Sequence, residues 1–121
     1  MVFKLRFIYI VLLLLSLPLF AQEWQQQRID ASSNPDEWIT KTNQWISQYD
    51  EGREFEKLAL AYALQSEAYR YSGNETKLIE TVKEGLRFAK LADSEVASAL
   101  LRINQTWYQL QRGQLQQANA S

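Results

Sequence analysis

From residue 34 onward, apolar side chains recur at the spacing of an α-helix, and glycines interrupt the pattern. The first apolar stripe contains Trp38, Ile39, Thr42, Trp45, Ile46 and Tyr49. Separations of one, three and four residues place these side chains on one side of a helix. Asn34 can cap this helix, and Glu37 stands where a capping box has its acidic residue. Pro35 suits the first turn, and we expect the helix to end at Gly52, because glycine adopts the left-handed conformation at little cost.

The same apolar spacing and the same glycine signals predict two further helices. The second is expected to begin at Arg53 or Glu54 and to end at Gly73. Its main face contains Phe55, Leu58, Ala59, Tyr62, Ser66 and Tyr69. The third is expected over residues 75–92 and has two apolar stripes, Leu78, Ile79, Val82, Leu86 and Ala89 in one and Thr81, Gly85, Phe88 and Ala92 in the other. A helix with two apolar stripes is typically sandwiched between neighbouring helices.

The last part of the chain predicts a fourth helix and the beginning of a fifth. Asp93 or Ser94 can cap the fourth helix, which we expect to end at Gly113, and the fifth would begin at Gln114. No alternating run of β-branched residues competes with this pattern. The connecting loops have one to three residues, which forces neighbouring helices to pack antiparallel. We therefore predict an all-α domain over residues 34–121. Residues 22–33 are polar and show no apolar stripe, so we expect a flexible lead-in there.

Residues 1–21 have the features of a secretory signal peptide. Lys4 and Arg6 precede a run of mostly apolar residues from Phe7 to Phe20, and Ala21 offers a small residue for cleavage. A membrane-spanning helix needs roughly 20 apolar residues, so the run is short for a permanent anchor. We expect cleavage and a periplasmic or secreted protein. The alternative is an uncleaved leader that anchors the protein in the inner membrane, and this leader is the only membrane contact that we expect.

The surroundings of Gly73 and Gly113 are similar. Each glycine follows an aromatic helix end and precedes a polar residue and a new helix, and a period of roughly 40 residues indicates stacked helical hairpins. Ser66, Tyr69 and Gly73 stand at spacings of three and four. In this pattern the chain resembles the tetratricopeptide repeat family.

The resemblance implies a short solenoid of stacked antiparallel helical hairpins. Gly85 and Ala118 match the small residues that this family places where helices approach closely. Leu78 departs from the family pattern, which prefers alanine there, and Arg102 and Gln105 stand in place of larger apolar residues. A four-helix bundle is the alternative fold. The final eight residues are too few to cap a solenoid, so we expect the chain either to be the front part of a longer protein or to need a partner.

Composition excludes most catalytic chemistry. The chain has no cysteine and no histidine, which removes thiolate nucleophiles, the commonest general base and the commonest metal ligand. Glu80 and Glu84 could act together in acid–base chemistry, but basic residues surround them as on a solvated helix face. Loss of the leader leaves 11 basic and 14 acidic residues, which gives no electrostatic basis for binding nucleic acid. We expect no enzyme activity, no cofactor and no metal site.

These observations favour a protein that acts by contact. The expected partner is a protein, a peptide or a small ligand. The resemblance extends to the exported sensor regions of bacterial signalling proteins such as diguanylate cyclases and histidine kinases, which implies a sensor role. The alternative function is a small structural or assembly subunit of a cell-envelope complex. Tyr71 and Tyr108 lie off the main apolar stripes and are the candidate contact residues, whereas we expect the other aromatic side chains in the core.

Overall fold

The structure, a computed structural model, describes residues 25–120, with side chains up to residue 116. Helices account for almost all of this range. They are a helix that covers residues 25–33, α2 (Pro35–Glu51), α3 (Phe55–Ser72), α4 (Glu75–Ala92) and α5 (Glu95–Ala120). The predicted all-α class is therefore confirmed for the described residues. The expected signal peptide, residues 1–21, lies outside them.

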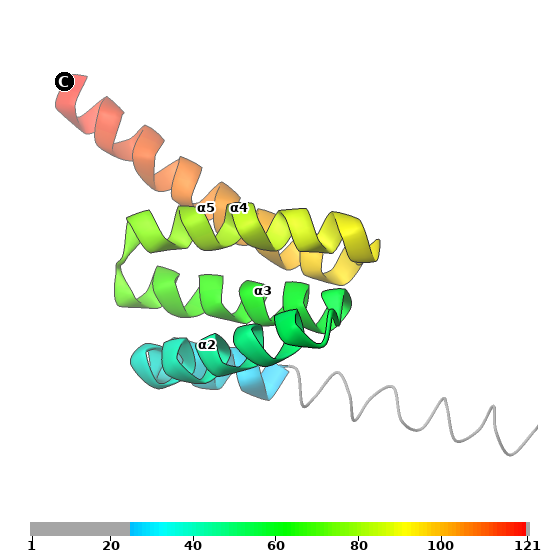
Figure 1. Ribbon diagram of the computed structural model, residues 1–121. Coiled ribbons are helices and arrows are strands. Elements are labelled where there is room, and N and C mark those ends of the chain that lie inside the picture. The colour runs from blue at the N-terminus through cyan, green and yellow to red at the C-terminus, as the bar shows by residue number, and fades with distance from the viewer. Residues whose placement is uncertain (1–24, 121) are drawn as a thin grey trace, which may run out of the picture.

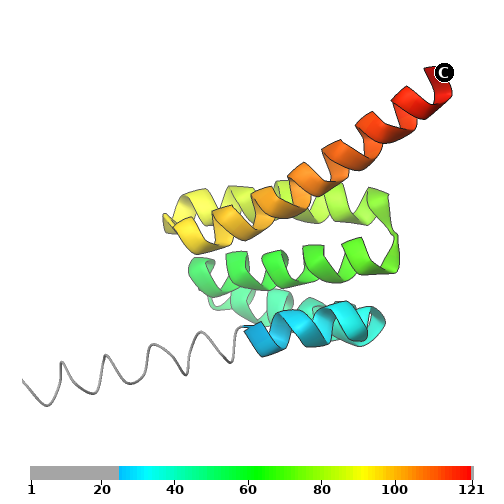
Figure 2. The same ribbon diagram turned by 180° about the vertical axis from the view of Figure 1, so that it is seen from behind.

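Consecutive helices run antiparallel and stack side by side, with α3 at the centre (Figure 1). α3 packs against α2, α4 and α5, and α4 also packs against α5. The helix at 25–33 lies against α3 as well, because Ala31 packs with Leu64 and Ala68. Within the described residues α2 contacts neither α4 nor α5. The reverse view shows α5 and the helix at 25–33 on the same side of the molecule (Figure 2).

The four helices α2 to α5 begin at residues 35, 55, 75 and 95, so their starts are evenly spaced along the chain. The short turns between them are closed in different ways. Gly73 ends α3 in the left-handed conformation with φ 78°, as predicted, and the Asn74 side chain caps α4 by accepting a hydrogen bond from the Lys77 backbone N–H at 3.1 Å. Ser94 caps α5 in the same way, because its hydroxyl accepts from the Ala97 N–H at 3.3 Å.

Two expected helix-terminal features are wrong. The end of α2 at Gly52 is confirmed, but Gly52 has φ −81°, and the left-handed residue of that turn is Arg53, with φ 53°. Asn34 makes no side-chain capping bond, so the expected capping box is not formed and Pro35 alone marks the start of α2. Of the two residues expected as alternative caps of α5, Ser94 forms the cap, and Asp93 takes the left-handed conformation after α4. Arg53 and Asp93 show that a turn in this chain can impose a positive φ without a glycine.

The predicted break at Gly113 is also wrong, since α5 continues without interruption to Ala120 and no separate helix begins at Gln114. The outer half of α5 extends beyond the other helices (Figures 1 and 2). No side chain or neighbouring helix lies within 4 Å of the position that a Cβ of Gly113 would take. Glycine lowers helix propensity by about 1 kcal/mol, which is a small cost beside an unbroken ladder of backbone hydrogen bonds. Nothing packs there to force a turn.

The expectation of a flexible lead-in over 22–33 is corrected for residues 25–33, which form a helix. Ala31 is fully buried and packs with Trp38, Leu64 and Ala68. Ala31 is the only buried residue among residues 25–33, so the sequence contained no apolar stripe that would reveal the helix. Residues 22–24 lie outside the described range.

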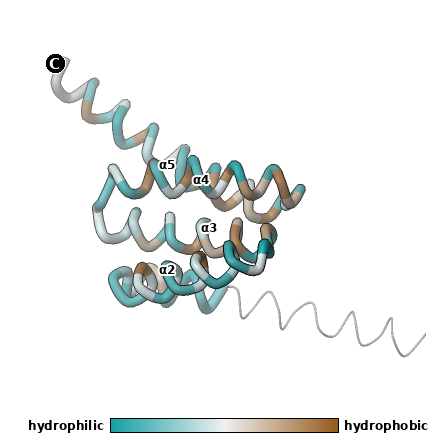
Figure 3. The backbone as a smooth tube through the Cα atoms, in the orientation of Figure 1, coloured by the Kyte–Doolittle hydropathy of each residue, from teal (hydrophilic) through white to brown (hydrophobic). Residues whose placement is uncertain are grey.

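The core lies mainly between α3, α4 and α5. Each of the two apolar stripes of α4 contributes three buried residues, as the sandwich prediction requires, and the buried residues of α4 are Leu78, Thr81, Val82, Gly85, Phe88 and Ala89. The Phe88 ring stacks on Phe55 at 5.9 Å and on Tyr62 at 5.7 Å between ring centroids. Burial raises the pKa of the Tyr62 phenol, and the negative charges of Glu84 and Asp50 raise it further. Along α4, hydrophobic positions are interspersed with hydrophilic ones (Figure 3).

Candidate functional site

Exposed apolar side chains gather on the side of the molecule formed by the helix at 25–33, α3 and α5. Four of the large apolar residues that are mostly exposed, namely Ile29, Tyr71, Ile103 and Leu110, line two hollows on these helices. We call this surface the contact face and define it by Arg28, Ile29, Arg70, Tyr71, Arg102, Ile103, Trp107 and Leu110. Because these side chains come from helices on one side of the molecule, this surface is the candidate interaction site.

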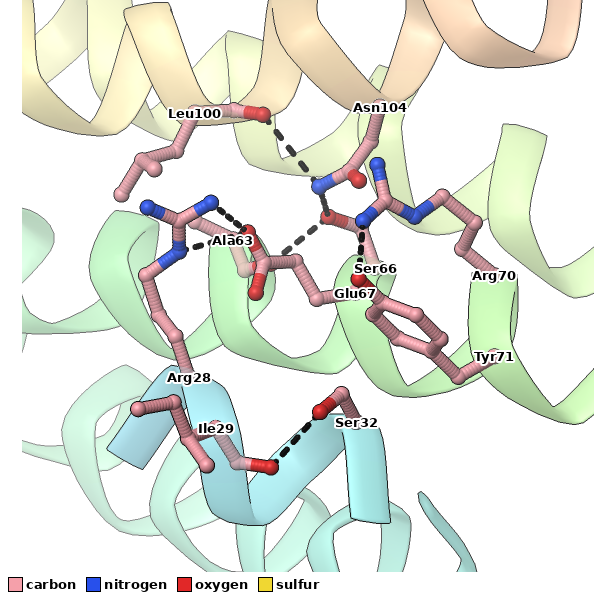
Figure 4. Close-up of polar contacts among 10 residues, drawn as sticks. All are labelled: Arg28, Ile29, Ser32, Ala63, Ser66, Glu67, Arg70, Tyr71, Leu100 and Asn104. Carbon is pink, nitrogen blue, oxygen red and sulfur yellow. Dashed lines mark hydrogen bonds and ion pairs between the residues drawn. The ribbon is translucent and has the colours of Figure 1, made fainter. Parts of the chain in front are cut away.

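The first hollow lies between the helix at 25–33 and α3 and has a volume of about 280 Å³. Its main charged groups are Arg28 and Glu67, whose side chains form a two-point contact. The Arg28 Nε and Nη2 atoms both lie 2.8 Å from Glu67 Oε1. Figure 4 shows this contact. The Glu67 side chain is only 3% exposed, whereas that of Arg28 is 36% exposed. The buried carboxylate of Glu67 therefore neutralises the positive charge of Arg28 at this end of the contact face.

The second hollow lies between α3 and α5 and has a volume of about 380 Å³. Its lining consists of Arg70, Ala99, Arg102, Ile103, Thr106, Trp107 and Leu110. Three of these side chains are large and apolar, and no acidic side chain is among them. The two guanidinium groups, from Arg70 and Arg102, make no salt bridge with any residue that the structure describes.

Arg70 is held in place by aromatic side chains. Its Nη2 donates a hydrogen bond to the Tyr71 hydroxyl at 2.6 Å (Figure 4). The guanidinium carbon lies 4.6 Å from the centre of the Tyr71 ring and 5.7 Å from that of Trp107. Such cation–π contacts are favourable but do not neutralise the charge. Arg70 is therefore a half-buried cation that aromatic rings from two helices hold in one region of the face.

A buried polar link beneath the contact face joins α3 to α5. Asn104 and Ser66 are both fully buried, and Asn104 Nδ2 donates to Ser66 Oγ at 2.8 Å and to the Leu100 carbonyl at 3.2 Å. Ser66 Oγ in turn donates to the Ala63 carbonyl at 2.7 Å (Figure 4). Because a buried amide strongly prefers a polar partner, this link fixes how α5 lies along α3. It therefore positions Trp107, one turn further along α5, next to Arg70.

Of the two tyrosines singled out from the sequence, the structure brings only one to the contact face. Tyr71 is 50% exposed and lines the first hollow. Tyr108 is partly buried against the main core, lines neither hollow of the contact face, and its hydroxyl accepts a hydrogen bond from Arg112 Nε at 3.0 Å. The sequence reasoning missed Arg28 and Ile29, because they stand in the segment expected to be flexible.

Other surfaces of the described residues offer less. A larger hollow, about 900 Å³, lies between α4 and α5, and its lining carries both signs of charge, with Glu84 and Arg87 already paired. Among the described residues, no cluster of three acidic side chains stands close enough to hold a metal ion. No helix in the same range combines the length and the apolar content that crossing a membrane requires.

Comparisons with known proteins identify no relative: no protein-family model matches the chain, and neither a curated protein nor a solved structure is significantly similar to it.

Proposed function

We propose that this protein is an exported helical interaction module whose contact face binds a partner protein or peptide. The observation that carries the proposal is the gathering of exposed apolar side chains from three separate helices, next to arginines without carboxylate partners in the described residues. Aromatic side chains and arginine are the residue types most enriched in protein interfaces. Trp107, Tyr71, Arg70 and Arg102 provide that combination on one face.

We also propose that the helices form a short repeat stack similar to tetratricopeptide repeats. The glycine pair that first suggested a repeat does not support it, because Gly113 lies inside α5. The evenly spaced helix starts support it instead, since the start of α4 follows that of α2 by the same interval as the start of α5 follows that of α3. α3 and α5 contact each other, whereas α2 and α4 do not. In a stack of hairpins, this difference means that the helices on one side of the stack lie closer together than those on the other side.

Export is proposed from the leader alone. If residues 1–21 are a cleaved signal peptide, the protein recovered from cells begins at Gln22, and intact-mass measurement of the purified protein tests this directly. Recovery of the uncleaved chain from the membrane fraction would favour an inner-membrane anchor. Recovery of the soluble, uncleaved chain from the cytoplasm would contradict export altogether.

Site-specific photo-crosslinking tests the interaction role in the cells that make the protein. A photoreactive amino acid at Ile103 or Leu110 lies on the contact face, and the same amino acid at Thr40 on α2 is a matched exposed control. We expect a discrete protein adduct from the two α5 positions and none from Thr40. Equal adducts from all three positions, or none from either α5 position, would rule out the contact face as the binding surface. A partner that belongs to an envelope complex would favour the assembly function over the sensor function.

A further inference from the structure

We propose that the hollow between α3 and α5 binds an acidic peptide segment, with a carboxylate on Arg70 and an adjacent apolar side chain against Trp107, Ile103 and Leu110. This inference rests on the proposed interaction role and deepens it by naming the chemistry of the partner.

The charge balance of the contact face is uneven along its length. At the first hollow, Arg28 is neutralised by the buried carboxylate of Glu67. At the second hollow, Arg70 and Arg102 have no carboxylate partner in the described residues, and the lining contains no acidic side chain. Arg102 is exposed, whereas Arg70 is partly buried, so a basic or neutral segment in this hollow would further desolvate the Arg70 cation without compensation, which costs free energy. An acidic segment compensates this charge.

Arg70 is positioned to receive that acid. A free arginine side chain loses much conformational entropy when it binds a ligand, whereas Arg70 is already restrained by the Tyr71 hydroxyl and by the rings of Tyr71 and Trp107. The guanidinium has five N–H donors, and the structure assigns one Nη2 bond to the Tyr71 hydroxyl. Donors remain for a carboxylate, which guanidinium groups bind through two parallel hydrogen bonds.

The apolar part of the lining requires a second feature of the ligand. Ile103 and Leu110 are both at least half exposed, and they flank Trp107 at spacings of four and three residues along α5. Ala99 and Thr106 also line the hollow, and their small side chains leave room beside the larger ones. A leucine-sized side chain next to the carboxylate would bury this surface. Free inorganic anions lack such a group, and a nucleic acid would carry far more charge than two arginines can balance on an acidic protein.

Peptide binding by the full chain, expressed with its own leader and purified, tests the proposal. The probe is a fluorescently labelled peptide, Gly-Glu-Leu-Asp-Leu-Glu-Gly, measured by fluorescence anisotropy at protein concentrations up to about 1 mM, the weak end of specific binding. Two matched probes replace the acidic residues with lysine or the leucines with serine. We expect saturable binding of the first probe and at least tenfold weaker binding of both replacements.

Variants then assign the binding to the hollow. We expect Arg70→Gln to weaken binding at least tenfold and Arg70→Lys to recover only part of it, because lysine lacks the planar fork. Arg112→Gln removes a positive charge from α5 outside the hollow and should change binding less than twofold. Circular dichroism spectra confirm that each variant is folded, and Arg102→Gln provides a second, more exposed substitution in the hollow.

Each outcome separates this inference from the proposed function. Absence of binding by the acidic probe, or equal loss in Arg70→Gln and Arg112→Gln, overturns the acidic-peptide proposal. So does equal binding of the serine-substituted probe, which would indicate charge attraction alone. If crosslinks still form at Ile103 under any of these results, the contact face remains an interaction surface for a partner of different chemistry. If crosslinks are absent as well, the proposed function itself fails.

Discussion

Substitution of Gly85 by alanine tests how tightly α4 is held between its two neighbours. A Cβ on Gly85 would lie 2.9 Å from the Cβ of Tyr62 on α3 and 2.8 and 3.0 Å from the two terminal carbons of Leu101 on α5. The Leu101 side chain can rotate away, but the Tyr62 Cβ is attached to the backbone. The new methyl group can therefore be accommodated only if α3 and α4 move apart.

The expected magnitude is the difference between two opposing effects. Alanine is favoured over glycine in a helix interior by about 1 kcal/mol. Insertion of a methyl group into a packed core typically costs about 1–3 kcal/mol, and contact on both sides of α4 places Gly85 toward the upper end of that range. We expect Gly85→Ala to lower the free energy of unfolding by about 1–2 kcal/mol, which is the propensity gain subtracted from the packing cost.

Gly113 provides the matched control, because it is also an interior helical glycine, yet no side chain or other helix lies within 4 Å of where its Cβ would be. Gly113→Ala should therefore retain the propensity gain and stabilise α5 by up to about 1 kcal/mol.

Urea denaturation followed by circular dichroism measures both variants, and thermal midpoints should shift by about 4–8 °C for each kcal/mol in a domain of this size. The packing described for α4 would be refuted if Gly85→Ala were as stable as the unsubstituted protein, or if Gly113→Ala were the more destabilised of the two.

Three further predictions concern buried polar groups. Ser66→Ala should cost about 1–3 kcal/mol by removing a partner of the buried Asn104 amide, and the double variant Ser66→Ala/Asn104→Leu should recover most of that loss. A denaturation double-mutant cycle measures the coupling, and additive effects would contradict the link. Arg28→Gln should destabilise the fold by about 1–3 kcal/mol, and by more than Glu67→Gln, because it leaves a buried carboxylate unpaired while Arg28 itself is partly in water. If urea denaturation showed the same loss of unfolding free energy for Arg28→Gln and Glu67→Gln, the helix at 25–33 would not be docked as described. Because the pKa of Tyr62 is raised in the folded state, the unfolded chain releases this proton first, near its ordinary pKa of about 10. The contribution of Tyr62 to the free energy of unfolding is thus complete below about pH 10 and should fall as the pH rises above that value. Between about pH 8 and 11, Tyr62→Phe should therefore lose less stability than the unsubstituted protein. An unchanged pH dependence in that variant would show that Tyr62 is not responsible.

Much of the fold could be predicted from the sequence, because the apolar stripes of α4 report directly on its two packed neighbours. Gly73 was also informative, since its turn requires a positive φ. Gly113 has the same residue type and similar neighbours in sequence, yet it lies inside a helix. Whether a glycine ends a helix depends on what packs around it, and a pattern along one segment does not contain that information.

The candidate site was harder to predict for the same reason. Tyr71 could be selected because it lies off the apolar stripe of its helix, but Arg70 gave no separate signal. Its role arises from Trp107, which is distant in sequence and reaches it only because α5 packs along α3. Similarly, the helix at 25–33 is held by Ala31 and by one ion pair, neither of which forms a periodic pattern.

The regular spacing of the helix starts has a consequence for how such a protein can change during evolution. A duplication of two consecutive helices with their turns would insert one complete hairpin. The even spacing of the helix starts would be kept. Because the backbone of α2 does not approach that of α4 or α5 within the described residues, distant hairpins would need little adjustment to the insertion. Under the proposed function, the contact face would lengthen in proportion, and longer peptides would be bound while the existing hairpins kept their amino acids.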